Sequence, residues 1–329
     1  MNTMKAMLTD KEHALHWSDV PFPVLQEDEV LVKVAAAGVN RADLLQREGN
    51  YPSPPGCPEW MGLEIAGEVA ALGSIARGKG RFQEGDKVCA LLGGGGYAEY
   101  AAVRYDMLLP PPEGFSLVQA AGLPETYATS YLNLKLEGDL QAGQTFYMPA
   151  GGSGLACTAI PMAKAMGAYV ISSVRTEEKI AFVKQMGADV VFNSKTEKPS
   201  DVLTRCAEEG HAVNLALDCV CGQELGDCLP AMARGGRWVI IAQLGGAFAT
   251  VPLLTMMQKG LRLVGSTLRS RTPEVKAQIL HALEKDIWPL LAAGKMQANI
   301  CRTFPMQEAD AAHRFLQESR NVGKVVLTL

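Results

Sequence analysis

A regular alternation of short apolar runs with helix-like stretches, which begins near residue 120, is the feature that most constrains the fold. Such alternation is typical of a parallel sheet whose strands are connected by crossover helices. It predicts an α/β domain with a doubly wound parallel sheet, whose strands lie at residues 145–148, 169–173, 189–192, 212–219, 237–242 and 261–264.

A glycine-rich turn follows the first of these apolar runs. Residues 150–156 read Ala-Gly-Gly-Ser-Gly-Leu-Ala and precede a helix-like stretch that extends to Gly167. Glycines let backbone N–H groups approach a pyrophosphate, and a helix N-terminus adds partial positive charge. A tight crossover can also use glycines, but strand, turn and helix in this order predict a Rossmann dinucleotide-binding domain. The expected contacts are Gly152, Ser153, Gly154 and Leu155.

Residues 25–110 have a different character. Short β-like runs at 30–34, 65–72, 87–92 and 97–103 are separated by Gly and Pro turns, which predicts a compact antiparallel β domain. A helix around 306–319 and a β run at 324–329 end the chain. A chain of 329 residues, 48% hydrophobic and 20% charged, is long enough for two such domains.

Composition and charge exclude several functions. A net charge of -4 without a basic stripe argues against nucleic-acid binding. The first ten residues lack the apolar core of a signal peptide, and no apolar run approaches the roughly 20 residues that span a bilayer. We therefore expect a cytoplasmic protein with no membrane partner, whose eight cysteines are reduced and form no structural disulfide.

Several short motifs resemble those of the zinc-free quinone oxidoreductases, the zeta-crystallin-like family of the medium-chain dehydrogenase/reductase superfamily. The resemblance spans the chain through AGVNRAD at 37–43, REGNYP at 47–52, GLE at 62–64, GDKV at 85–88, LPET at 123–126, LRSR at 268–271 and NVGKVV at 321–326. It implies a GroES-like β-barrel catalytic domain, residues 1–120 and 270–329, and a Rossmann NADPH-binding domain, residues 121–269. It also implies a homodimer in which Rossmann sheets join edge to edge and cover an exposed edge strand.

The resemblance bears on metal binding at two positions. Leu63 stands where the zinc-dependent relatives place a histidine ligand, and Asn40 stands where they place a cysteine. Because an aliphatic side chain has no lone pair to offer, we expect no metal site. Glu64 is expected to be a buried polar anchor, and Asp43 and Arg47, four residues apart on a helix, to form a supporting ion pair.

The end of the second Rossmann strand indicates the choice of cofactor. NAD enzymes place an acidic residue there for the ribose 2′-hydroxyl, whereas this chain reads Ser172-Ser173-Val174-Arg175. Ser173, Arg175 and Lys179 could bind a 2′-phosphate, so NADPH is favoured, although Arg175 and Lys179 also fit solvated charges at a helix start.

Further cofactor contacts follow from the resemblance alone. They are Asn193, Gly222, Gln243, Leu244, Gly245, Arg271, Asn321, Gly323 and Lys324. Arg269 and Arg271 occupy positions that approach the cofactor in similar enzymes, and a surface position or a dimer contact is the alternative for one of them.

The implied chemistry is hydride transfer from NADPH to a small quinone. A quinone that accepts hydride becomes a stabilised oxyanion, so a hydroxyl or amide donor suffices. Tyr51 is the first candidate donor, followed by Asn40 and Thr129, while a half-buried loop aromatic is the structural alternative for Tyr51. Two other functions stay open: an NADPH-dependent enoyl or alkenal double-bond reductase, and a non-catalytic NADPH-binding protein.

Overall fold

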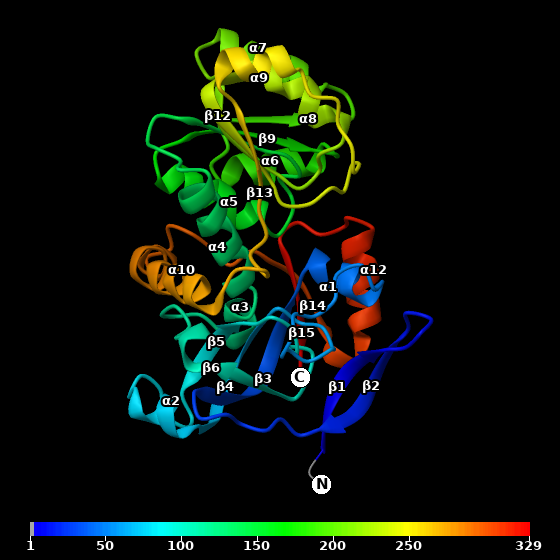
Figure 1. The fold of residues 1–329 in the computed structure, drawn as a ribbon, viewed down its shortest axis with the longest axis vertical. Helices are drawn as coiled ribbons and strands as arrows, with labels where there is room; N and C mark the ends of the chain where they lie inside the picture. The colour runs from blue at the N-terminus through cyan, green and yellow to red at the C-terminus, as the bar shows by residue number, and fades with distance from the viewer. Residues whose placement is uncertain (1–2) are drawn as a thin grey trace. The chain divides into compact units, whose positions relative to one another are not determined.

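The structure, a computed structural model, describes residues 3–329 and contains two compact units (Figure 1). The β unit comprises the described residues up to Ala128 together with Arg269–Leu329, and the Rossmann unit comprises Thr129–Leu268. The chain therefore enters the β unit twice, with the Rossmann unit inserted between the two passages.

The sheet of the Rossmann unit has six strands in the order β10-β9-β8-β11-β12-β13, all in parallel pairs. In chain order this is 3-2-1-4-5-6, the doubly wound arrangement that binds dinucleotides. The six predicted strands are confirmed, and the largest difference is the early start of β12. Their bounds are β8 (Thr145–Met148), β9 (Tyr169–Val174), β10 (Val190–Asn193), β11 (Val213–Asp218), β12 (Met232–Ile240) and β13 (Arg262–Gly265).

Helices connect these strands and cover the sheet. They are α4 (Pro124–Tyr131), which crosses the boundary between units and continues as the π-type turn η2 (Leu132–Glu137), then α5 (Ala156–Ala165), α6 (Glu178–Gln185), α7 (Pro199–Glu208), α8 (Gln223–Cys228), the short turn η3 (Leu229–Ala231) and α9 (Leu253–Lys259).

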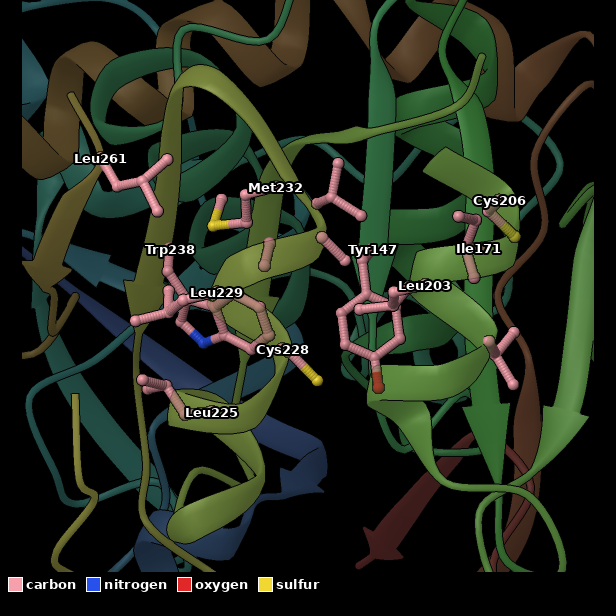
Figure 2. Close-up of a cluster of buried hydrophobic side chains, with 14 of the residues drawn as sticks. Tyr147, Ile171, Leu203, Cys206, Leu225, Cys228, Leu229, Met232, Trp238 and Leu261 are labelled. Atoms are coloured by element: carbon pink, nitrogen blue, oxygen red, sulfur yellow. The ribbon is translucent and has the colours of Figure 1, made fainter. Parts of the chain in front are cut away.

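A core cluster lies between the sheet and α7 and α8 (Figure 2). Tyr147 of β8 and Trp238 of β12 lie at its centre, with ring centroids 5.9 Å apart. Leu203 and Leu229 pack against them from the helical side. Burial of each such side chain contributes about 1.5–3 kcal/mol, so this layer stabilises the sheet whose strand ends carry the predicted cofactor residues.

The sheet of the β unit has the order β14-β15-β3-β4-β5-β7, and β6 pairs with β3 outside that path. The final strand β15 is antiparallel to β3, so the end of the chain rejoins this unit. The strand bounds are β3 (Glu29–Val39), β4 (Glu64–Leu72), β5 (Lys87–Leu91), β6 (Tyr100–Arg104), β7 (Leu108–Leu109), β14 (Ile300–Pro305) and β15 (Lys324–Thr328).

The β unit also contains a separate hairpin and several helices. The hairpin pairs β1 (Thr3–Thr9) with β2 (Leu15–Pro21), and like β14 it is absent from the sequence prediction. The helices are α1 (Arg41–Arg47), α2 (Ser74–Gly78), α3 (Leu117–Ala120), α10 (Pro273–Asp286), α11 (Trp288–Ala292) and α12 (Ala309–Gln317), with the short turns η1 (Tyr105–Met107) and η4 (Met306–Glu308).

Within residues 3–329, no helix combines the length and apolar character that crossing a membrane requires. The same residues include all eight cysteines, and no disulfide joins any two of them.

Candidate active site

In the glycine-rich turn after β8, the backbone of Gly151 and of Gly152 lies close to neighbouring side chains. A Cβ on Gly152 would lie 2.9 Å from Cδ of Lys179, and one on Gly151 would overlap the Ser172 hydroxyl. Ala156 is fully buried at the start of α5. The turn therefore keeps open backbone beside a lysine and a helix N-terminus, a combination that fits a pyrophosphate.

The segment after β9 contains the residues predicted to bind a 2′-phosphate and also a carboxylate, Glu177, that the sequence analysis did not consider. Ser173 is buried, with its hydroxyl 3.5 Å from the hydroxyl of Tyr147, whereas Arg175 is exposed. Asn193 donates from Nδ2 to Oε1 of Glu177 at 2.7 Å. Glu177 is only two residues beyond Arg175, and Asn193 holds its carboxylate at the end of β10.

The loops after β11 and β12 run side by side. Gly245 donates its backbone N–H to the Val220 carbonyl at 2.7 Å, and Leu244 donates to the Cys219 carbonyl at 3.2 Å. Gly222 has a φ of 67°, and a Cβ there would lie 2.8 Å from the Gly245 carbonyl oxygen. The predicted residues Gly222, Leu244 and Gly245 therefore belong to one layer of backbone, and the Gln243 and Leu244 side chains are exposed beside it.

In the β unit, Lys324 forms a buried ion pair with Glu64, and the predicted residue Asn40 is hydrogen-bonded to both side chains. The Lys324 ammonium donates to Oε1 of Glu64 at 2.5 Å, to Oδ1 of Asn40 at 2.8 Å and to the Val39 carbonyl at 3.1 Å. Asn40 in turn donates from Nδ2 to Oε1 of Glu64 at 3.0 Å. Glu64 is fully buried, which confirms its role as a polar anchor, and the network fixes both ends of the Asn40 amide.

These residues do not fit a catalytic zinc ion. Leu63 is buried and offers no lone pair, and the carboxylate of Glu64 already holds the Lys324 ammonium. A second cation at Glu64 would meet this ammonium at close range, which is unfavourable. In the part of the chain that the structure describes, no group of three or more His, Cys, Asp and Glu side chains is arranged to hold a metal.

The prediction of an ion pair between Asp43 and Arg47 is wrong, because each side chain has other partners. Asp43 accepts from the backbone N–H of Asn40 at 2.7 Å and of Gly62 at 3.0 Å, and from the Tyr97 hydroxyl at 3.2 Å. Arg47 pairs instead with Asp310 of α12 at 2.7 Å. Asp43 lies in the first turn of α1, where free backbone N–H groups compete successfully for a carboxylate.

The Tyr97 hydroxyl also lies 3.4 Å from Nε2 of His313, which is buried in α12. Burial raises the pKa of Asp43 from 3.8 to about 6. Burial lowers the pKa of His313 from 6.5 to about 3, with a smaller contribution from the Arg47 charge. The neutral form of His313 is therefore the one that the folded protein favours.

Tyr51 lies in the loop after α1, half-buried beneath a guanidinium. The Arg269 guanidinium lies 4.8 Å from the centre of the Tyr51 ring, and Nη1 of Arg269 donates to the Tyr51 carbonyl at 3.1 Å. Burial raises the pKa of Tyr51, and the Arg269 charge opposes that shift while Glu125 adds to it. Sequence reasoning did not connect Arg269 with Tyr51, because the two positions are far apart in the chain.

The remaining predicted residues lie in three places. Asn321 is buried and donates from Nδ2 to the Gly323 carbonyl at 2.9 Å, just before β15. Thr129 lies on α4, where its carbonyl accepts from Nδ2 of Asn133 at 2.7 Å. Arg271 is half-buried in the segment that precedes α10.

Comparisons with known proteins agree with both units. The model for the alcohol dehydrogenase GroES-like domain matches residues 26–113, and the model for zinc-binding dehydrogenases matches residues 154–285. The quinone oxidoreductase of Sus scrofa is 31% identical over 314 residues, which cover 95% of this chain and 92% of that protein. The quinone oxidoreductase of Mus musculus is 30% identical over 315 residues, with the same two coverages of 95% and 92%.

Solved structures extend the likeness to the whole fold. The quinone oxidoreductase from Thermus thermophilus, whose complex with NADPH is also solved, is 32% identical with a TM-score of 0.81, and the match covers 99% of this chain and 100% of that one. CurK enoyl reductase has a TM-score of 0.86 at 23% identity, with 99% of each chain covered, and so shares the fold.

Proposed function

The chain belongs to the medium-chain dehydrogenase/reductase superfamily of oxidoreductases, and on that premise we propose that it reduces small quinones with NADPH and without a metal ion. The observation that carries the proposal is the buried ammonium of Lys324 between Glu64 and Asn40. Because the ammonium occupies the Glu64 carboxylate, the β unit offers a substrate hydrogen-bond donors and not a bound metal ion. Quinone reduction requires no more than such donors.

The Rossmann unit supplies the residues proposed to hold NADPH. Gly152, Ser153, Gly154 and Leu155 offer backbone and the start of α5 to the pyrophosphate, and Lys179 lies directly over Gly152. When bound, NADPH supplies a hydride from its nicotinamide ring.

Preference for NADPH rests on Ser173, Arg175 and Lys179, whose charges and hydroxyl suit a 2′-phosphate. Glu177 is the opposing residue, and its hydrogen bond with Asn193 holds the carboxylate against β10. Further proposed contacts are Gly222, Gln243, Leu244, Gly245, Arg271, Asn321 and Gly323. All three ammonium hydrogens of Lys324 have acceptors inside the β unit, so we propose that Lys324 acts on the site through Asn40.

The β unit supplies the proposed substrate donors. Tyr51 would donate a hydrogen bond to the quinone oxygen on which negative charge develops, and Asn40 would orient the ring through an amide fixed by Lys324 and Glu64. Thr129, at the start of the Rossmann unit, would position the nicotinamide. Positioning and electrostatics then supply the catalysis, since hydride transfer to an electrophile needs no covalent step.

Reduction of an activated C=C bond is the second candidate function, and the raised pKa of Glu125 supports it. That reaction needs a proton donor at the α carbon. Burial and the neighbouring Glu64 raise the pKa of Glu125 to about 7, and its charge acts on Tyr51. A carboxyl that is partly protonated at neutral pH suits such a donor.

We also propose a homodimer that joins two Rossmann sheets along β13. This strand ends the sheet and pairs only with β12, so one side of its backbone lacks a partner strand within the described chain. Leu263 of β13 and Leu253, Leu254 and Met257 of α9 are exposed on the same unit. Exposed apolar side chains on an edge strand and on a helix of the same unit suit a second copy of the chain.

The test is oxidation of NADPH by the purified protein, measured with a panel of quinones and a panel of alkenones, and repeated with NADH. The proposal expects quinones to be reduced faster than alkenones, and NADPH to be preferred over NADH. Faster reduction of an alkenone than of any quinone favours the second candidate. Binding of NADPH without turnover on either panel leaves only a cofactor-binding protein.

A further inference from the structure

Arg269 is a buried arginine at the point where the chain returns from the Rossmann unit to the β unit. Its Nε donates to the Gly93 carbonyl at 2.8 Å, and its Nη2 donates to Oε1 of Gln46 at 2.8 Å and to Oγ of Ser53 at 3.3 Å. Together with the contacts to Tyr51, these bonds place one guanidinium among three segments of the β unit.

The acceptors around Arg269 are all neutral. Within the described residues its guanidinium forms no ion pair, whereas the other buried cation described above, Lys324, is paired with Glu64. Removal of a charge from water without an opposite charge is costly, and neutral hydrogen bonds offset only part of that cost. Such a cation imposes a positive field on its surroundings, and the face of the Tyr51 ring is the nearest aromatic surface to it.

The contacts also require the shape of arginine. Bonds to the Tyr51 carbonyl and stacking over the Tyr51 ring hold both the backbone and the side chain of one residue. A lysine ammonium can keep the charge but has neither the planar face nor the five donors. At Gly93, which supplies one of the accepting carbonyls, a Cβ would overlap Sγ of Cys57.

We propose that Arg269 is a positioning residue for the reduction of quinones, which holds the Tyr51 hydroxyl in place and stabilises the negative charge that develops on the substrate oxygen bound to it. This inference rests on the proposed function. In that reaction NADPH would be oxidised and the quinone reduced: the C–H bond of the dihydronicotinamide would break, the hydride would form a bond to one quinone oxygen, and the displaced electron pair would reside on the other oxygen. A proton from water then completes the hydroquinone.

Two other charges lie close enough to matter. Glu125 acts on Tyr51 in the opposite direction to Arg269, and Lys276 donates from Nζ to the Arg269 carbonyl at 2.8 Å. Lys276 shares the positive sign of Arg269, so it does not neutralise the guanidinium. The net field at Tyr51 therefore depends on the presence of Arg269.

The test compares Arg269→Lys and Arg269→Met with Tyr51→Phe and with both double variants. We expect kcat for quinones to fall on the order of 10- to 100-fold in Arg269→Met and less in Arg269→Lys, with the Kd for NADPH changed by less than about twofold. If Arg269 acts through Tyr51, the double variants are hardly slower than the slower single variant. Arg77→Met, which removes an exposed guanidinium paired with Glu84, is the matched control.

A second readout separates positioning from a purely structural role. Loss of the positive charge should make kcat depend more steeply on the electron deficiency of the quinone, because the substrate must then stabilise its own oxyanion. Unchanged kcat in Arg269→Met, or fully multiplicative losses with Tyr51→Phe, would overturn the inference. If Arg269→Met does not fold, the Arg269→Lys cycle decides alone, and wild-type protein without quinone turnover refutes the proposed function instead.

Discussion

Glu64 connects three parts of the β unit through one carboxylate. It accepts from the Lys324 ammonium, from the Asn40 amide and, through Oε2, from the backbone N–H of Glu125 at 2.9 Å. The carboxylate also packs over Gly38, where a Cβ would overlap it. Loss of either partner of this buried ion pair should cost much stability, because the charge that remains is then buried without an opposite charge.

Lys324→Met should therefore destabilise the protein by about 3–5 kcal/mol, since it leaves the Glu64 carboxylate buried and unpaired. The double variant Lys324→Met with Glu64→Gln should recover part of this loss. Chemical denaturation of the three proteins measures the effect. Lys5→Met is the control, because the pair between Lys5 and Asp19 is exposed and should contribute at most about 1 kcal/mol. Equal losses from Lys5→Met and Lys324→Met would contradict the account.

His313 gives a prediction about pH. Its pKa falls from 6.5 to about 3 on folding, so its contribution to stability is present above pH 6.5 and is lost as the pH falls toward 3. Asp43 has the opposite sign, since its pKa rises from 3.8 to about 6 and its contribution is lost as the pH rises through 6. Between about pH 4 and 6, acidification therefore lowers the stability through His313 and raises it through Asp43.

His313→Gln should remove one of these opposing effects. Relative to the wild type, the variant should lose less stability on acidification between about pH 6 and 4, by up to about 1.4 kcal/mol per pH unit. Denaturation curves across this range measure the difference, and His281→Gln, an exposed histidine of α10, is the control. Parallel curves for wild type and His313→Gln would show that His313 does not titrate as described.

Among the elements, the alternation of apolar runs with helix-like stretches predicted all six Rossmann strands. Short apolar runs report strand positions well because each buried strand must be apolar on both faces. The strands β2 and β14 lack such runs, since each of them buries a single residue, and β1 buries three of its seven residues. The pairing of β14 with β15 also joins residues more than 20 positions apart, which a local pattern does not contain.

The turn after β8 should bind the cofactor, and a substitution at Gly152 tests this. Gly152→Val should displace Lys179 and fill the space beside the helix start, and the Kd for NADPH should rise roughly 10- to 100-fold, as loss of a charge-assisted hydrogen bond implies. Fluorescence titration with NADPH measures the change. Gly78→Ala is the control, because that position has open space around it. Unchanged affinity in Gly152→Val would remove this turn from the cofactor site.

The edge strand β13 makes a prediction about assembly. Leu263→Glu combined with Met257→Glu places charges on the proposed interface, and the protein should then sediment at half the mass of the wild type. Analytical ultracentrifugation gives the two masses, with NADPH binding as a check that the Rossmann unit is folded. A monomeric wild type, or a double variant that stays dimeric, would refute the proposed interface.

For the whole molecule, the residues proposed for the cofactor lie mainly in the Rossmann unit, and those proposed for the substrate lie mainly in the β unit. Motifs along the chain are the basis on which both sets are proposed. They did not identify Arg269 as a partner of Tyr51, Asp310 as a partner of Arg47, or Glu177 as a partner of Asn193. These pairs join segments that only the folded chain brings together.

The proposed reduction of quinones by NADPH uses no metal ion. Metal analysis and quinone-dependent NADPH oxidation can be performed on the same purified sample before and after treatment with a chelator. We expect turnover with far less than one divalent ion per chain and no change in rate after chelation. A stoichiometric divalent ion whose removal abolishes turnover would refute the proposal.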